Sequence, residues 1–105
     1  MIYRVVIQPQ ARAEAMQGFR WIAEHSSAAA ARWLAGLQKA TAKLATYPER
    51  NPLAIEESER FGFPIRLSLY GRRRGIYRIL YSIEDDMISV LAIRHSAQGP
   101  INPIE

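Results

Sequence analysis

Residues 65–94 alternate apolar and polar side chains in three successive runs, and this pattern predicts three short β-strands. A glycine-flanked basic loop at 71–75 separates the first two runs, and the acidic residues 84–86 separate the last two. Both connections suit hairpin turns, so consecutive strands should pair antiparallel. In the third run, alternation puts Met87, Ser89, Leu91 and Ile93 on one face and Ile88, Val90, Ala92 and Arg94 on the other.

The first half of the chain predicts one strand and two helices. Residues 2–7 form the strand, and Pro9 suits the first turn of a helix that runs to about residue 25. A serine of the pair Ser26-Ser27 can cap the start of the next helix, which is expected over 28–46 because apolar residues recur there every three or four positions. The short connection implies that the two helices form an antiparallel hairpin.

The sequence predicts how four aromatic side chains and one glycine pack. Trp21 and Trp33 are expected in the core or in the seam of the helical hairpin, and Tyr77 and Tyr81 in the core, since aromatic side chains bury much of their surface. Gly18 costs its helix about 1 kcal/mol relative to alanine unless it permits close packing.

Two segments predict little regular structure. In the segment 47–64, Pro48 and Pro52 end the second helix, and the rest is expected to be a surface connection with room for one helical turn. Its carboxylates, Glu57 among them, are expected to be solvated. Residues 96–105 contain one glycine and two prolines and predict a short tail rather than a helix.

Together these elements predict an α+β fold with the order βααβββ, in a single domain over 1–105. The helical hairpin covers one face of a small, mostly antiparallel four-stranded sheet, and the other face stays at least partly exposed. Strand alternation puts one arginine of each strand on this exposed face: Arg4, Arg66, Arg78 and Arg94. The members of such a cluster would repel one another without an anion or acidic peptide among them, so a functional role is favoured for the cluster. The alternative is that one or two of the arginines are solvated or paired with the acidic residues 84–86.

Composition narrows the possible chemistry. The chain has 105 residues, enough for one modest core, and no cysteine, which excludes disulfides and thiolate catalysis. With only two histidines, no metal site and no cofactor are expected. The sequence shows neither a signal peptide nor a membrane-spanning stretch, so a soluble cytoplasmic protein is the default expectation.

The charge is basic and carried by arginine. The formal net charge is +4, and twelve of the fourteen cations are arginine. Arginine makes planar, bidentate contacts with phosphate and carboxylate, so this bias favours nucleic acid or an acidic protein segment as a partner. A GC-rich genome would produce the same bias through codon usage, so composition alone leaves both interpretations open.

Several segments, in this order and spacing, resemble the RelE/ParE superfamily of bacterial toxins from type II toxin–antitoxin modules of the plasmid-stabilisation type. The most specific are Tyr77-Arg78-Ile79-Leu80-Tyr81 and Ile93-Arg94-His95. The others are Tyr3-Arg4-Val5-Val6-Ile7 with Pro9, Trp21-Ile22-Ala23-Glu24, Leu44-Ala45-Thr46-Tyr47-Pro48 and the run from Gly71 to Ile83. The resemblance implies a growth-inhibiting toxin that a cognate antitoxin neutralises with an extended, partly disordered acidic or amphipathic segment. It also implies that operator DNA is bound only through the toxin–antitoxin complex.

The resemblance implies two modes of toxicity. RelE-like members cleave mRNA in the ribosomal A site, and for this mode the candidate catalytic residues are Arg66, Arg78 and His95. ParE-like members bind DNA gyrase and block it without hydrolytic chemistry. The ParE-like mode is favoured because Ser68 stands where the RNA-cleaving members have a lysine, and because the C-terminal arginine and tyrosine of those members are missing from 97–105.

In the ParE-like mode, exposed arginines are expected to contact the target or the antitoxin: Arg4, Arg72, Arg73, Arg74 and Arg94. A third hypothesis is a degenerate toxin that serves only as the structural partner of an operon repressor. Growth arrest on induction would argue against this third hypothesis.

Overall fold

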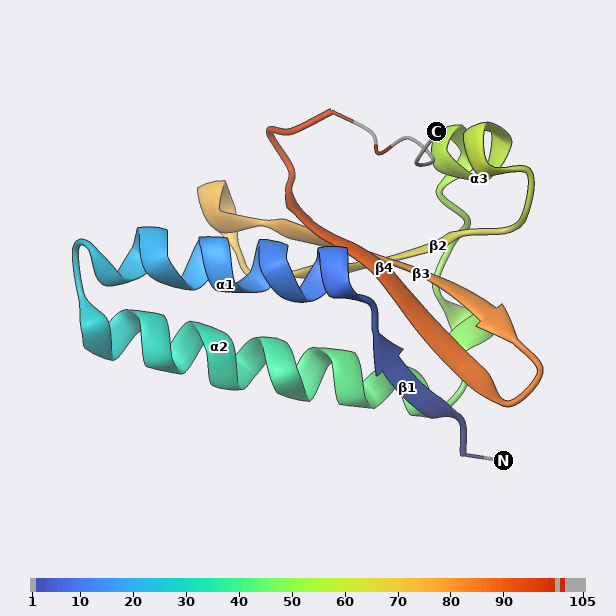
Figure 1. The fold of residues 1–105 in the computed structure, drawn as a ribbon, viewed down its shortest axis with the longest axis horizontal. Coiled ribbons are helices and arrows are strands. Elements are labelled where there is room, and N and C mark those ends of the chain that lie inside the picture. The colour runs from blue at the N-terminus through green and yellow to red at the C-terminus, as the bar shows by residue number, and fades with distance from the viewer. Residues whose placement is uncertain (1, 100, 102–105) are drawn as a thin grey trace.

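The structure, a computed structural model that describes residues 2–99 and 101, packs three α-helices against a four-stranded sheet (Figure 1). In chain order the elements are β1 (Arg4–Ile7), α1 (Pro9–Ala23), α2 (Ser27–Ala42), the 3-10 turns η1 (Lys43–Ala45) and η2 (Pro48–Arg50), α3 (Ile55–Phe61), β2 (Arg66–Tyr70), the 3-10 turn η3 (Arg73–Gly75), β3 (Tyr77–Glu84) and β4 (Met87–His95). The strand order is β1-β4-β3-β2, with β1 parallel to β4 and the other pairs antiparallel. The predicted α+β fold and its βααβββ order are confirmed.

Helices α1 and α2 lie side by side as an antiparallel hairpin on one face of the sheet (Figure 1). Pro9 occupies the first turn of α1, where a missing N–H leaves no hydrogen bond unmade. The Ser26 hydroxyl accepts a hydrogen bond from the Ala29 N–H at 3.1 Å and caps α2. Tyr47, which follows η1, has a left-handed backbone with φ of 50°, and this conformation turns the chain away from the helix axis before Pro48.

The main core lies between the helical hairpin and the sheet. Its centre consists of buried apolar residues from both layers: Ala11, Ala15, Leu37, Leu44, Tyr77, Ile79, Tyr81, Ile88, Val90 and Ile93. The small side chains of α1 let that helix approach β4 closely, while β3 and β4 supply the large ones. The prediction that Tyr77 and Tyr81 are core residues is confirmed, since they are 8% and 0% exposed.

A β-bulge in β4 corrects the predicted faces of that strand. Strict alternation would separate Val90 from Ile93, but the register shifts by one residue at Leu91, so that Tyr81 pairs with Val90 while Leu80 pairs with Ala92. Val90 and Ile93 both face the helical hairpin as a result. The prediction was wrong here because alternation assumes an unbroken ladder, which one extra residue interrupts.

The second face of the sheet is partly covered, not open. Helix α3 packs there, with Ala54, Ile65, Leu80, Ala92 and Ile101 forming a second buried cluster. The Ser58 hydroxyl of α3 accepts a hydrogen bond from the Ile65 N–H and donates one to the Ile65 carbonyl, which anchors the helix beside β2. The segment expected as a surface connection therefore contributes to the core. No helix in the described ranges is both long and apolar enough to cross a membrane.

Two helical glycines permit close packing. A Cβ on Gly18 would lie 2.9 Å from the Trp33 ring, so Gly18 permits the close packing that the sequence analysis named as the reason for a glycine in this helix. A Cβ on Gly36 would overlap the Tyr70 hydroxyl, which donates a hydrogen bond to the Trp33 carbonyl at 2.6 Å. Gly36 thus lets α2 approach the edge strand β2.

We predict that Gly36→Ala destabilises the protein, although alanine favours helix by about 1 kcal/mol. The new methyl group must displace Tyr70 and break its hydrogen bond to α2. Urea unfolding should show a lower free energy of unfolding for Gly36→Ala, and the loss should be smaller when Gly36→Ala is introduced into Tyr70→Phe, which lacks the hydroxyl. An equal loss in both backgrounds would contradict this origin of the effect.

Candidate functional site

Arg78, a candidate catalytic residue, forms an ion pair with Glu57 of α3. The Arg78 Nη2 and Glu57 Oε2 atoms are 3.0 Å apart, and the Glu57 side chain is only 2% exposed. The expectation that Glu57 is solvated was wrong, because α3 turns this carboxylate inward onto the sheet. A buried carboxylate is stable only with a cation beside it, and Arg78 supplies that cation.

Arg94 is the cross-strand neighbour of Arg78 and has its own carboxylate partner. Its Nη1 atom is 3.4 Å from Glu14 Oε2 of α1, and the other oxygen of Glu14 accepts a hydrogen bond from the Ile93 N–H at 2.9 Å. The four charged residues therefore form a row across the sheet in the order Glu57, Arg78, Arg94 and Glu14. In this arginine–carboxylate row the like charges of the two arginines are offset by a carboxylate on each side.

Arg66 lies on the opposite face from Arg78. It pairs with Tyr81 in the sheet, and paired residues share a face, so its side chain is on the side of the helical hairpin. Its guanidinium donates hydrogen bonds to the carbonyls of Glu49 and Asn51, at 3.0 and 2.6 Å. Arg66 thereby holds the connection after α2 against the sheet.

Tyr81 stabilises the same connection from beneath. Its hydroxyl donates to the Pro48 carbonyl at 2.6 Å and accepts a hydrogen bond from the Asn51 side chain at 2.9 Å. Burial raises the pKa of Tyr81 above its ordinary value of 10.0, while the Asn51 hydrogen bond and the positive charge of Arg66 act in the opposite direction. The neutral phenol is therefore the form that the fold stabilises.

His95 closes the end of β4. Its Nδ1 atom accepts a hydrogen bond from the Ala97 N–H at 3.0 Å, its own N–H donates to the Gln98 side chain at 2.9 Å, and its ring lies edge-on to Tyr77 with centroids 5.3 Å apart. These contacts fit a residue that orders the turn after the strand. A proton donated to a substrate would have to come from Nε2.

The three candidate catalytic residues are not brought together. Arg66 is opposite Tyr81 in the sheet and His95 is opposite Tyr77, four residues further along β3, which corresponds to about 13 Å. Arg78 points to the other face. The predicted cluster of four arginines is formed only in part. Arg4, Arg78 and Arg94 share the face away from the helical hairpin, with Arg78 and Arg94 as cross-strand neighbours, but Arg66 lies on the other face. The prediction failed at Arg66 because its strand was assigned to the wrong face.

The remaining predicted contact residues occupy other parts of the surface. Arg4 pairs with Met87 at the far end of β4 and lies 3.7 Å from its sulfur atom. Arg72 and Arg73 are exposed at the hairpin tip between β2 and β3, where Arg73 has a left-handed backbone with φ of 58°. The Arg74 side chain lies outside the described part of the chain. Arg4 is exposed as well, so these basic positions are accessible at two separate places.

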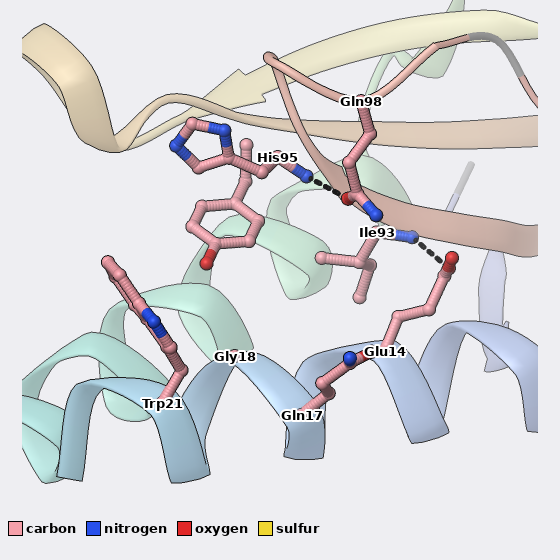
Figure 2. A pocket seen from close by; sticks show the side chains of 8 residues that line it. Glu14, Gln17, Gly18, Trp21, Ile93, His95 and Gln98 are labelled. Atoms are coloured by element: carbon pink, nitrogen blue, oxygen red, sulfur yellow. Dashed lines mark hydrogen bonds between the residues drawn. The ribbon is translucent and has the colours of Figure 1, made fainter. Parts of the chain in front are cut away.

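A pocket of about 390 Å³ opens between α1 and the end of β4 (Figure 2). Helix α1 contributes Glu14, Gln17, Gly18 and Trp21, and the strands and the following turn contribute Tyr77, Ile93, His95 and Gln98. Figure 2 shows Trp21 on one side of the opening with His95 and Gln98 above it. The pocket combines an aromatic wall with amide groups and one carboxylate, a surface that suits an anchoring side chain of a partner.

Trp21 corrects a sequence prediction. It is 61% exposed and lies edge-on to His25, whereas Trp33 packs against Tyr70 and Tyr77 as expected for a core residue. The signal for this difference is in the sequence. The buried stripe of α1 is Ala11, Ala15 and Gly18, at spacings of four and three, and Trp21 belongs to the neighbouring stripe with Glu14 and Gln17.

Tyr77 gives this pocket a hydrogen-bond donor. Burial raises the pKa of Tyr77 above 10.0, so its hydroxyl stays protonated and can donate a hydrogen bond near neutral pH. In residues 2–99 and 101, no three histidine, aspartate or glutamate side chains gather in a way that would hold a metal ion.

A comparison with known families identifies a family that the chain matches. A family model for the ParE toxin of the type II toxin–antitoxin system, parDE, matches residues 5–100, which include every helix and almost every strand residue described above. No curated protein matches the chain.

We predict that Glu57→Ala lowers the free energy of unfolding by roughly 3 kcal/mol, because it leaves Arg78 half-buried without its counter-charge. Glu56→Ala is the matched control, since Glu56 forms an exposed pair with Arg60 on the same helix and exposed pairs contribute about 0–1 kcal/mol. Urea unfolding of both variants measures the difference. Equal small losses would show that the Glu57–Arg78 pair does not anchor α3.

We predict that Tyr81→Phe changes the alkaline stability of the protein. A pKa raised by folding contributes stability that is present below about pH 10 and is lost as pH rises through the folded value. The variant should lose about 1–3 kcal/mol at pH 7, where two hydrogen bonds disappear, and should then lose less stability than the wild type above about pH 10. Urea unfolding at both pH values tests this, with the exposed Tyr47→Phe as a control. Parallel pH profiles for wild type and Tyr81→Phe would contradict the prediction.

Proposed function

The chain belongs to the ParE toxin family of type II toxin–antitoxin systems, and we propose that it arrests growth by binding and inhibiting DNA gyrase in the cytoplasm. In this proposal the protein acts as a binding inhibitor and performs no hydrolysis of its own. Its cognate antitoxin holds it inactive until the antitoxin is lost.

The separation of the candidate catalytic residues is the observation that carries this proposal. Cleavage of RNA through the 2′-hydroxyl needs a base, a cation beside the phosphate and an acid for the leaving oxygen, all within hydrogen-bond reach of one phosphate. Here Arg66 and Arg78 lie on opposite faces of the sheet, and His95 lies about 13 Å along the strand from the position of Arg66. One phosphate cannot touch all three.

The engagement of these residues supports the same conclusion. Arg78 neutralises a buried carboxylate, and Arg66 donates to two backbone carbonyls. A residue that holds the fold in this way cannot leave its partner during catalysis without exposing an unpaired buried group, which is costly. Catalytic use of Arg78 would therefore require α3 to leave the sheet.

The exposed hairpin tip is the best candidate for the gyrase contact. Arg72 and Arg73 are exposed in the turn between β2 and β3. Exposed arginines on a protruding turn reach carboxylates of a protein or phosphates of its bound DNA, and they accelerate association by electrostatic steering.

We predict that the purified protein inhibits the supercoiling of relaxed plasmid by gyrase and that Arg72→Glu with Arg73→Glu weakens this inhibition at least about tenfold. The matched control is Arg12→Glu with Arg20→Glu, which makes the same change in net charge at two exposed positions of α1 and should inhibit nearly as well as the wild type. Both variants should retain the wild-type unfolding midpoint.

Mapping of new RNA 5′ ends shortly after induction separates this function from its rival. Growth arrest without codon-positioned cuts in translated messages agrees with gyrase inhibition. Abundant cuts of that kind would contradict the proposal and establish a ribosome-dependent RNase. Neither arrest nor cuts would indicate a degenerate toxin that has kept only its structural role.

A further inference from the structure

The edge strand β2 leaves part of its backbone unpaired. It pairs with β3 on one side, and on the other side the chain at 52–54 covers only its beginning. There the Ala54 N–H donates to the Ile65 carbonyl at 2.7 Å, and the Leu67 N–H donates to the Pro52 carbonyl at 3.0 Å. The covering segment goes no further along the strand.

The two hydrogen bonds to the chain at 52–54 show which backbone N–H and C=O groups of β2 point away from β3. Backbone groups of a strand point alternately to its two sides, so the odd-numbered residues of β2 direct theirs away from β3. The Leu67 carbonyl and both backbone groups of Leu69 therefore face outward. Within the described part of the chain, none of the backbone hydrogen bonds outside the sheet ladder involves these groups. They form a short open edge that can accept another strand.

A basic groove lies beside this open edge. It has a volume of about 390 Å³ between α2 and β2, and its cations are Lys39, Lys43 and Arg50. Lys39 and Lys43 are the two lysines of the chain, and both are exposed. No aspartate or glutamate lines the groove in the described residues. The groove therefore presents three positive charges without an internal counter-charge and favours an acidic occupant.

The other side of the edge is apolar. Leu69 points to the face opposite the helical hairpin and is 63% exposed, an unusual position for a leucine in a strand. A strand added to β2 would alternate its side chains between the two faces. One row would lie over the three cations, and the other row would pack against Leu69. The matching sequence has acidic and apolar residues in alternation.

We propose that an extended segment of the cognate antitoxin, with alternating acidic and apolar residues, binds here as a fifth strand along β2. The proposal rests on the assignment of the chain as an antitoxin-neutralised toxin and is independent of whether gyrase is the target. A nucleic acid fits less well, because phosphates would engage the cations but would use neither the open backbone edge nor Leu69.

A synthetic peptide of the matching chemistry tests this surface directly. A fluorescein-labelled peptide of about nine residues with alternating glutamate and valine should bind the full chain, as measured by fluorescence anisotropy. The corresponding lysine–valine peptide should bind at least about tenfold more weakly. A duplex DNA oligonucleotide that binds the groove more tightly than the acidic peptide and displaces it would overturn the proposal.

Three variants separate the contributions of charge and backbone. Lys39→Glu with Lys43→Glu should weaken peptide binding at least about tenfold, whereas Arg12→Glu with Arg20→Glu, which changes net charge equally, should leave it nearly unchanged. Leu69→Pro should fold, because proline is tolerated at a strand edge where the sheet does not use the N–H. It should also abolish binding, because it removes an outward N–H that the added strand would pair with. Retained peptide binding both in Lys39→Glu with Lys43→Glu and in Leu69→Pro would refute strand addition.

Amide exchange and growth assays complete the test. The Leu69 amide should exchange more slowly in the peptide complex, and an unchanged Leu69 amide would contradict pairing at this edge. In cells that also express the cognate antitoxin, Lys39→Glu with Lys43→Glu should still arrest growth but should escape neutralisation. If the variant escapes neutralisation while gyrase in the arrested cells remains active, the proposed target is wrong but the docking site stands. If the antitoxin fully neutralises the variant, the docking site is wrong but the proposed target is unaffected.

Discussion

The second face of the sheet depends on the placement of one buried charge. Glu57 lies on a seven-residue helix that is too short to be stable alone, so its position must come from tertiary contacts. Turning a carboxylate inward is tolerable only because Arg78 lies 3.0 Å away. That pair, with the two Ser58–Ile65 hydrogen bonds, holds α3 over the second apolar cluster. A face that alternation alone would leave open is closed in this way.

This arrangement has consequences for function. Arg78 and Arg94 each lie beside a carboxylate, so the charges on this part of the sheet are largely offset. The net positive charge of the chain is therefore carried by other residues. The accessible basic positions include the hairpin tip and the groove beside β2. Binding surfaces at the periphery of a fixed sheet suit an inhibitor of another protein better than they suit a phosphate-cleaving centre, which needs its groups convergent.

The sequence predicted the fold well because hydrophobic periodicity is a local property. The two helices, the four strands and their order follow from spacing, from Pro9 and Ser26, and from the hairpin signals. What failed depended on registers and contacts between distant segments. The bulge at Leu91 moved Ile93 to the other row, and the pairing of Arg66 with Tyr81 put that arginine with the helices. The burial of Glu57 depends on Arg78, twenty-one positions away, a distance at which a single sequence carries little signal.

The proposed antitoxin strand and the hairpin tip are linked by the course of the chain. β2 ends at Tyr70, and Arg72 lies three residues after Leu69, so the open edge lies within about 11 Å of the tip along an extended backbone. This is comparable with the Debye length of about 8 Å at physiological ionic strength, so a charge on the edge acts on the tip in screened form. An acidic strand on β2 would therefore lower the positive potential at Arg72 without covering it. Neutralisation would act through the field that recruits the target as well as through the space that the antitoxin occupies.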